Sequence, residues 1–390
     1  MAPILKSAHI KNFKSLGDVN LNFKNLTIIV GANSSGKSSC LESLNLLKTI
    51  VKVGKAPPSW YLEDDIRIGE ESSGIILQVF ISDAKDADYS VNLVLQGNVE
   101  ENFIIVSENL KISKTKVIAI SKGEGEVRDE NNKGKQLYRS TPDTVALSST
   151  GSFGMKPVTK NVADFIKQWE FYDLDPDVIK SYETRGFKNE TGDNPMRLDS
   201  FGRQLQGLLQ HWASDSNDQL FKEVAAEIQQ CLNIDLISGD HKGKQVIKIK
   251  EQNGLEIPFS NLSDGTLRMI GYCSLLYSPD IPSLIAIEEP ERNLHPGILQ
   301  DLASILKRLS QKTQVIITTH SSQLLDCFDI SDILSDVSVI LVKKNLELGT
   351  EAVGLDKLSQ DCDGLRDWMQ DFGIGSAIYH SNLIQEVLAN

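Results

Sequence analysis

Short apolar runs separated by polar turns fill the first 50 residues, in a pattern typical of an α/β domain. Apolar residues over 4–10 and 19–23 predict two strands, and the apolar run Leu26–Val30 predicts a third. Residues 39–51 are compatible with a helix. A strand, a glycine-containing turn and a helix are thus expected to follow one another directly.

The pattern changes twice further along the chain. Short alternating runs over residues 75–120 predict an antiparallel sheet with one solvated face, and the Gly-rich, charged segment 121–135 is expected to be a mobile loop or a hairpin tip. Apolar positions at helical spacing over residues 162–232 predict a helical insertion, with strands expected at 234–236 and 246–249. We therefore predict three parts: an N-terminal lobe with the antiparallel sheet (residues 1–160), a mainly helical insertion (161–255), and a C-terminal lobe of alternating strands and helices (256–390).

The segment from Gly31 to Ser38 matches the complete phosphate-loop pattern G-x-x-x-x-G-K-[ST], between the predicted strand and the predicted helix. Gly31 and Gly36 let the backbone turn so that successive N–H groups face a phosphate, and the helix N-terminus adds its dipole. Lys37 is expected to bridge the β- and γ-phosphates, and the Ser38 hydroxyl to bind Mg²⁺. The sequence therefore predicts a nucleoside triphosphate site made of Gly31, Asn33, Ser34, Ser35, Gly36, Lys37, Ser38 and Ser39.

Three carboxylates follow the apolar strand predicted at residues 283–287. Glu288 and Glu289 come directly after it, and Glu291 follows one proline later. A buried strand that ends beside a phosphate loop can place one carboxylate near Mg²⁺ and the next against the attacking water. We assign Glu288 to the metal and Glu289 to the water, as a positioning group or general base.

Two further segments have residues suited to a phosphate. The apolar strand predicted at residues 315–318 leads into His320, and the C-terminal ends of strands are where open α/β sheets bind ligands, so His320 is a candidate γ-phosphate contact. Ser263 and Gly265 stand at the start of a helix predicted over residues 267–277. A hydroxyl, free backbone N–H groups and the positive end of a helix dipole together suit a phosphate there.

Composition and charge narrow the class of protein. The 390 residues are 40% hydrophobic and 24% charged, which suits a globular protein, and the formal net charge of −13 disfavours broad non-specific nucleic-acid binding. Residues 111–160 contain ten Lys or Arg against five Asp or Glu, a local net charge of +5, and form a candidate contact surface. Five cysteines without a C-x-x-C pair predict reduced thiols. No apolar run reaches the roughly 18 residues of a membrane span and no signal-peptide core is present, so we expect a cytoplasmic protein without a membrane partner.

The order of these motifs resembles that of ABC-type ATPase heads: a phosphate loop, a Leu-Ser-Asp-Gly signature at 262–265, an apolar strand with two glutamates, and Thr-His-Ser at 319–321. Within that class, Ile10-Lys11-Asn12-Phe13-Lys14-Ser15 and Leu294-His295-Pro296 resemble the RecF/SMC/OLD-like branch, which includes stand-alone ATPases of prokaryotic anti-phage defence systems. The resemblance implies an α/β fold: a P-loop NTPase, ABC-type ATPase head with an antiparallel β subdomain and a helical insertion.

The resemblance also implies how such a head would work. Two chains would form a head-to-tail homodimer, or a higher oligomer, that sandwiches two ATP molecules, with Ser263 and Gly265 of one subunit on the γ-phosphate held by Lys37 of the other. His320 would sense that phosphate, and residues 293–295 would lie at the dimer interface. Glu288 replaces the usual aspartate and Asp264 the usual second glycine, so hydrolysis is expected to be slow. Candidates for the family's metal-contacting glutamine are Gln78 and Gln96.

Other functions share part of this pattern. A transporter ATPase subunit has the same motifs but a much shorter segment than the 224 positions from Ser38 to Leu262. An OLD-type nuclease needs a further acidic domain, whereas residues 337–342 and 350–353 are predicted as closing strands of the ATPase, so no nuclease activity is expected in this chain. A DNA-repair or DNA-clamp ATPase and a non-hydrolytic, nucleotide-gated scaffold stay open as alternatives. The favoured function is an ATPase whose dimerisation controls a separate effector protein, such as a nuclease, or engagement with DNA, in anti-phage defence.

Overall fold

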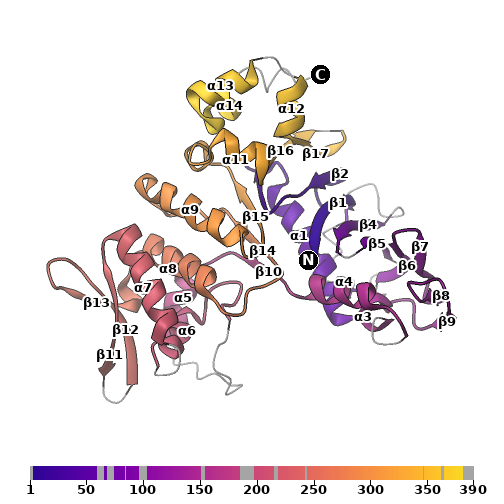
Figure 1. The fold of residues 1–390 in the computed structure, drawn as a ribbon, viewed down its shortest axis with the longest axis horizontal. Helices are drawn as coiled ribbons and strands as arrows, with labels where there is room; N and C mark the ends of the chain where they lie inside the picture. Colours follow the sequence, from indigo (N-terminus) through magenta and orange to yellow (C-terminus); the bar gives the residue numbers. More distant parts are fainter. Residues whose placement is uncertain are drawn as a thin grey trace. The chain divides into compact units, whose positions relative to one another are not determined.

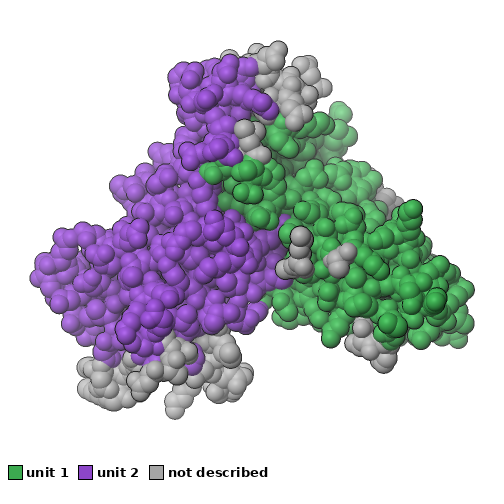
Figure 2. All heavy atoms as spheres, in the orientation of Figure 1, with its two compact units in different colours: residues 1–170, 332–363 green, residues 171–331, 364–390 purple. Residues whose placement is uncertain are grey.

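The computed structural model divides the chain into two compact units (Figure 2). Unit 1 consists of residues 1–170 and 332–363, and unit 2 consists of residues 171–331 and 364–390. The residues that the structure describes are 3–58, 66–67, 74–83, 85–95, 103–150, 154–184, 197–214, 218–241, 244–345, 347–361 and 364–380.

A large antiparallel sheet forms one part of unit 1 (Figure 1), as the alternating pattern predicts. Its described strands are ordered β2-β1-β4-β5-β6-β7-β8-β9, and inward positions such as Leu77 and Val79 are buried whereas their neighbours are more exposed. The strands are β1 (Ile4–Phe13), β2 (Leu16–Asn22), β4 (Ile75–Ser82), β5 (Asp86–Leu95), β6 (Phe103–Ile112), β7 (Thr115–Ser121), β8 (Glu124–Arg128) and β9 (Lys135–Arg139).

One local prediction in this sheet is wrong. Residues 121–135 were expected to be a loop or a hairpin tip, but Glu124–Arg128 is strand β8, which pairs with β7 on one side and β9 on the other. Its five residues contain one apolar side chain, Val127, so an alternating apolar pattern does not mark the strand. Cross-strand ion pairs, Glu126 with Lys135 and Glu124 with Arg139, contribute to its pairing with β9. The turns on either side of β8, at residues 122–123 and between β8 and β9, keep the expected hairpin character.

The rest of unit 1 is built around β3 (Leu26–Val30), whose five residues are all buried. Strand β16 (Val337–Asn345) pairs parallel with β3, and β17 (Gly349–Gly354) pairs antiparallel with β16, so the predicted closing strands are confirmed. Helix α1 (Lys37–Val53) follows β3 and packs against α3 (Leu147–Thr150) and α4 (Pro157–Lys167). Helix α12 (Leu355–Asp361) packs on β16 and β17.

Unit 2 contains a helical group, a small antiparallel sheet and a pair of parallel strands (Figure 1). Strands β14 (Leu284–Glu288) and β15 (Gln314–Thr319) are parallel and almost wholly buried, as their apolar runs predict. Helix α8 (Asp264–Tyr277) packs between α7 (Asp218–Leu232) and α9 (Leu299–Ser310), and α9 also covers β15. The remaining elements of the helical group and small sheet are α5 (Pro176–Thr184), α6 (Leu205–Trp212), β11 (Asp235–His241), β12 (Lys244–Lys250), β13 (Glu256–Pro258) and the 3₁₀ turns Phe259–Asn261 and Pro296–Ile298.

Short helices complete the C-terminal part of the chain. They are α10 (Ser322–Leu325), α11 (Ile330–Ser335), α13 (Leu365–Phe372) and α14 (Ile374–His380), while β10 (Trp169–Tyr172) lies at the first passage between the units. Helix α14 packs on α10 and on α13. Across the described ranges, the structure has no helix with both the length and the apolar character that crossing a membrane requires.

Candidate nucleotide-binding and catalytic sites

The phosphate loop of unit 1 has a backbone that only glycine fits at two positions. A Cβ atom on Gly31 would lie 2.3 Å from the carbonyl oxygen of Val342, and one on Gly36 would lie 2.2 Å from Thr350 Oγ1. Gly36 also has a φ of 104°, in the left-handed region, and ends the loop where α1 begins. Space therefore requires glycine at both positions, and the turn geometry requires it at Gly36 as well.

Two residues that the sequence analysis did not assign to the nucleotide site, Thr350 and Ser15, support this loop. The Thr350 hydroxyl on β17 lies 3.0 Å from the carbonyl oxygen of Ser35 and 2.9 Å from Ser15 Oγ. The backbone N–H of Thr350 donates to the carbonyl oxygen of Ser15 at 2.7 Å. No local motif marks Thr350, because its role depends on the pairing of β17 with β16, far along the chain.

The loop has the groups that a polyphosphate would engage. Helix α1 has no side-chain cap hydrogen bond at its N-terminus, and the positive end of its dipole lies at the end of the loop. The Ser35 hydroxyl is buried and has no hydrogen-bond partner among the described residues. The Lys37 ammonium group donates to the carbonyl oxygens of Gly31 and Ala32 at 3.0 and 3.1 Å, so it lies directly over the loop. The predicted residues from Gly31 to Ser39 thus fit a phosphate chain.

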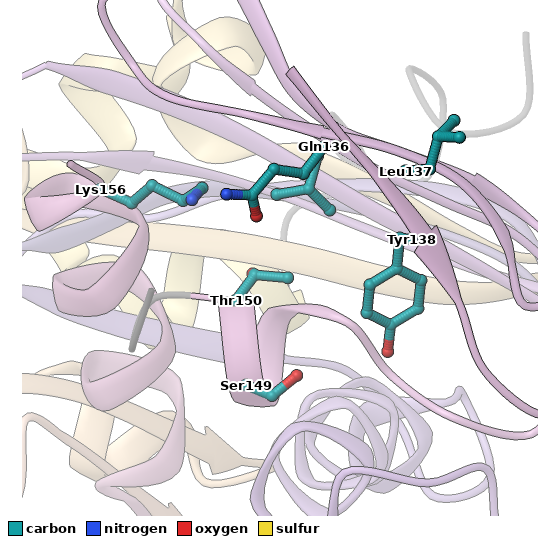
Figure 3. A pocket seen from close by; sticks show the side chains of 7 residues that line it. Gln136, Leu137, Tyr138, Ser149, Thr150 and Lys156 are labelled. Carbon is teal, nitrogen blue, oxygen red and sulfur yellow. The ribbon is translucent and has the colours of Figure 1, made fainter. Parts of the chain in front are cut away.

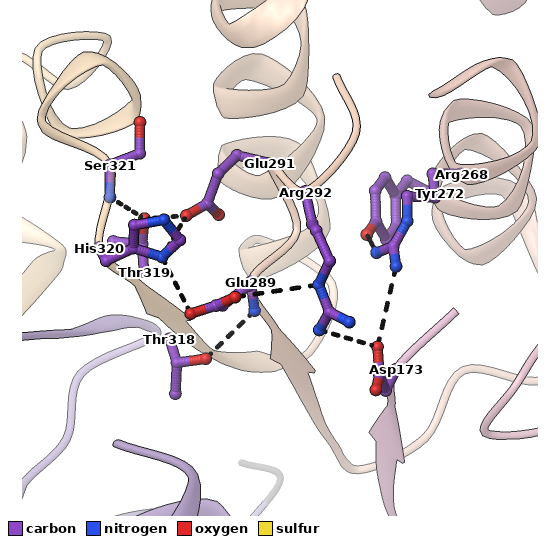
Figure 4. Close-up of polar contacts among 10 residues, drawn as sticks. All are labelled: Asp173, Arg268, Tyr272, Glu289, Glu291, Arg292, Thr318, Thr319, His320 and Ser321. Atoms are coloured by element: carbon purple, nitrogen blue, oxygen red, sulfur yellow. Dashed lines mark hydrogen bonds and ion pairs between the residues drawn. The ribbon is translucent and has the colours of Figure 1, made fainter. Parts of the chain in front are cut away.

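Glu289 and His320 lie together in unit 2, as Figure 4 shows. Glu288 ends β14 opposite Thr318 of β15, and the backbone N–H of Glu289 donates to Thr318 Oγ1 at 3.1 Å. Glu289 has a positive φ of 40°, an uncommon conformation for a non-glycine residue. His320 Nδ1 lies 2.9 Å from Glu289 Oε1. Two side chains assigned separately from the sequence are therefore in direct contact.

Glu291 is a buried carboxylate next to this pair. The Thr319 hydroxyl donates to Glu291 Oε1 at 2.5 Å, and His320 Nδ1 lies 3.9 Å from the same oxygen. Burial raises the pKa of Glu291, and the hydrogen bond from Thr319 opposes that shift. The Thr319 hydroxyl also accepts a hydrogen bond from the backbone N–H of Ser321, which fixes the chain just after His320.

Charged residues continue from Glu289 toward helix α8 (Figure 4). Arg292 Nε lies 3.8 Å from Glu289 Oε2, and its terminal nitrogen lies 3.2 Å from Asp173 Oδ1. Asp173 also faces Arg268, a buried residue of α8, at 3.9 Å. The sequence analysis identified none of these three residues, because each becomes part of the network only through folding.

The signature segment lies against the chain that follows Glu289. Ser263 caps α8, with its Oγ accepting from the backbone N–H of Thr266 at 3.1 Å. A Cβ atom on Gly265 would lie 2.7 Å from the carbonyl oxygen of Asn293. Asp264 accepts from the Lys180 ammonium group at 2.7 Å and from the Asn293 side-chain amide at 3.3 Å. Signature residues and residues 293–295 are thus neighbours within unit 2.

The predicted metal ligands are few, as is usual for Mg²⁺. Within the described ranges, no group of three or more His, Cys, Asp or Glu side chains could hold a metal ion. Mg²⁺ commonly binds one or two protein oxygens, phosphate oxygens and water. Ser38 lies on the first turn of α1 and Glu288 lies at the end of β14, and their role as Mg²⁺ ligands stays a prediction.

The two glutamine candidates have different outcomes. Gln78 lies on β4, where its amide donates to Asp88 Oδ1 at 2.7 Å, so it is engaged within the antiparallel sheet. Gln96 lies outside the described residues.

A separate cavity of about 210 Å³ lies beside the edge strand β9 in unit 1 (Figure 3). It is lined by Gln136 and Tyr138 of β9, by Thr150 of α3 and by Lys156, whose ammonium group lies 3.3 Å from Asp129 Oδ1. None of the predicted nucleotide-site residues lines it.

The fold and these sites define a P-loop ATPase of the ABC type, similar to SMC heads and to the stand-alone ATPases of anti-phage defence systems. A sequence family described as "AAA domain, putative AbiEii toxin, Type IV TA system" matches residues 26–326, and the chain belongs to this family.

Relatives and a solved structure agree with this class. An ATP/GTP phosphatase of Helicobacter pylori is 24% identical over 359 residues, covering 84% of this chain and 88% of the relative. The Septu protein PtuA of Bacillus thuringiensis is 22% identical and covers 93% of this chain and 84% of its own length. The structure of an SMC head bound to the C-winged helix domain of ScpA gives a TM-score of 0.51 at 12% identity, covering 91% of this chain and 99% of that one, which shows the shared fold.

Proposed function

We propose that this chain is a cytoplasmic ATPase that converts ATP and water to ADP and phosphate, and that its ATP-dependent dimerisation controls a separate effector in anti-phage defence. The observation that supports it most directly is the contact of Glu289 with His320 at the ends of two buried parallel strands. Binding alone does not need a paired carboxylate and imidazole at that edge, whereas hydrolysis of a phosphoanhydride does need a group that positions water.

In this proposal the loop of unit 1 binds the nucleotide, and the carboxylates of unit 2 supply the group that positions water for hydrolysis. Lys37 leaves the carbonyl oxygens of Gly31 and Ala32 and binds the β- and γ-phosphates, and the positive end of the α1 dipole favours the negative phosphate chain. Ser38 and Glu288 are the residues proposed to hold Mg²⁺, which would supply positive charge to the phosphates. Glu289 orients the water, and His320, held through Nδ1, presents its other ring nitrogen to the γ-phosphate.

The signature segment is proposed to act on the nucleotide of a second subunit. Ser263 is exposed at the N-terminus of a 14-residue helix, where its hydroxyl and the helix dipole suit a phosphate. Asp264 would repel that phosphate, but Lys180 and the Asn293 amide already engage its carboxylate. The remaining repulsion and the longer Glu288 side chain both favour slow turnover.

An effector protein, such as a nuclease, is favoured over direct DNA contact through residues 111–160. Four of the basic residues in that stretch already face acidic partners: Arg128 and Lys135 pair with Glu126, Arg139 with Glu124, and Lys156 with Asp129. These pairs reduce the charge available for phosphate contacts. Similarity over most of the chain to the Septu protein PtuA supports a role in defence.

The proposal is tested by the solution mass of the Glu289→Gln protein with and without Mg-ATP. Because this variant should bind ATP without turning it over, a doubling of mass with ATP is expected. Lys37→Ala in the same background is the control and should stay at its nucleotide-free mass. Cysteine pairs at Ser263 and Ser34 should crosslink between subunits only with ATP. Unchanged mass together with no crosslink would overturn the head-to-tail dimer.

A further inference from the structure

The C-terminal helix α14 is fixed to the segment that follows His320. The backbone N–H of Gly375 donates to Asp326 Oδ1 at 2.8 Å, just after α10. A Cβ atom on Gly375 would lie 2.1 Å from the carbonyl oxygen of Ser322, so the two backbones are in close approach. Gly373, which has a φ of 89°, likewise has no room for a side chain beside Asp326. Helix α14 therefore has a defined position relative to the chain that holds His320.

Two buried polar atoms in unit 2 are of complementary kind. The Tyr379 hydroxyl on α14 and Glu291 Oε2 are both buried, and neither has a hydrogen-bond partner among the described residues. The hydroxyl can donate a hydrogen bond, and the carboxylate oxygen can accept one. Glu291 Oε1 is already held by the Thr319 hydroxyl, so Oε2 is the oxygen that lacks a donor.

Tyr379 lies on the same face of α14 as Gly375, one helical turn further along, and Gly375 abuts Ser322, three residues after Thr319. Burial, and then the negative charges of Glu291 and Glu289, raise the pKa of Tyr379 to about 12. The phenol therefore keeps its proton at neutral pH and remains a donor. Buried polar atoms in folded proteins nearly always find a protein or water partner, so two unsatisfied ones in this part of unit 2 require an explanation.

We propose that the Tyr379 hydroxyl is linked to Glu291 Oε2 through one buried water, and that Tyr379 is thereby a positioning residue for Glu289 and His320. With both oxygens held, the Glu291 carboxylate cannot rotate away from Thr319 and His320. His320 then stays against Glu289, 2.9 Å away. This inference rests on the proposed ATPase function for its catalytic consequence, but the water-mediated link itself does not.

The water-mediated link is tested by a double-mutant cycle on the nucleotide-free protein. Tyr379→Phe removes only the hydroxyl, and Glu291→Leu removes the acceptor oxygens while keeping much of the side-chain volume. Tyr379→Phe should lower the Tm by about 2–4 °C in the wild type and by less than about 1 °C in the Glu291→Leu background. Tyr277→Phe is the matched control, because its hydroxyl lies 2.6 Å from Glu227 in the same unit, and its loss should be the same in both backgrounds. An equal loss for Tyr379→Phe in both backgrounds would overturn the pairing.

The positioning role is tested by steady-state ATP hydrolysis. Tyr379→Phe should lower kcat about three- to tenfold, the value of one hydrogen bond, with KM for ATP within about twofold. Tyr277→Phe should leave kcat unchanged. Coupling in the Tm cycle with an unchanged kcat would refute the positioning role. A wild-type protein without ATPase activity would instead overturn the proposed function, and the Tm cycle would still decide the pairing.

Discussion

Replacing Glu289 by glutamine removes one negative charge while keeping the shape of the side chain. The amide oxygen of glutamine can still accept from His320 Nδ1 at 2.9 Å, so the imidazole should stay in place. The weak ion pair with Arg292, at 3.8 Å, is lost, but Arg292 keeps its ion pair with Asp173 at 3.2 Å. The main loss is therefore the carboxylate that orients water and can take its proton.

The size of the effect follows from that loss. A positioned general base contributes about 10²- to 10⁴-fold to a rate, which corresponds to about 3–5 kcal/mol at 1.36 kcal/mol per tenfold. We expect kcat for ATP to fall by that factor. The dissociation constant for ATP should change by no more than about twofold, because the phosphate-binding groups are on the loop and on α1.

Phosphate release at saturating ATP measures kcat, and titration calorimetry measures nucleotide affinity. Glu256→Gln is the matched control, since Glu256 is an exposed glutamate of unit 2 that pairs with Lys248 at 2.9 Å, away from the catalytic cluster. It should leave both quantities unchanged. Turnover by Glu289→Gln within about threefold of wild type would refute the assignment of Glu289 as the water-positioning group.

Three other predictions test separate parts of the molecule. Lys37→Ala should weaken ATP binding at least about tenfold in calorimetry, because a desolvated ammonium group and its phosphate contacts are lost; unchanged affinity would exclude the loop as the site. Burial raises the pKa of Glu108 from 4.5 to about 7, so its contribution to stability is complete below about pH 4.5 and is lost as the pH rises to about 7. Glu108→Gln should therefore flatten that decline in Tm between pH 5 and 8, and a parallel decline in the variant would contradict the assignment. Lys133→Glu with Lys135→Glu should leave DNA binding and effector binding unchanged if residues 111–160 are a solvated face, and a clear loss in gel-shift or pull-down assays would restore that stretch as a contact surface.

Local patterns predicted the elements whose signal lies within one segment. The buried strands β3, β14 and β15 appear as uninterrupted apolar runs, and the phosphate loop is a contiguous motif between a strand and a helix. Strand β8 was missed because glycine and charged residues dominate it, and its stability comes from partners on β7 and β9. Periodicity detects burial along one strand but not the ion pairs between strands.

Sequence patterns did not predict the residues that support the phosphate loop and the Glu289–His320 pair. Thr350 and Ser15 meet beside the phosphate loop although 335 positions separate them in the chain. Asp173 joins Arg268 and Arg292 from three different elements. Ser15 stands in a segment that was noted only for its family resemblance, and nothing in the immediate sequence of Thr350, Asp173 or Arg268 marks a supporting role. The sequence also did not predict that residues 332–363 belong to unit 1, because they join it through the pairing of β16 with the distant strand β3.

That return has a consequence for how the protein is made. The ribosome produces the Gly31–Ser38 loop early, but β16, which pairs with β3, and Thr350, which holds the Ser35 carbonyl oxygen, are produced only after all of residues 171–331. A growing chain therefore lacks the support of its phosphate loop until the catalytic carboxylates have already been synthesised. We therefore expect an incomplete chain that ends before Thr350 to bind ATP more weakly than the finished protein.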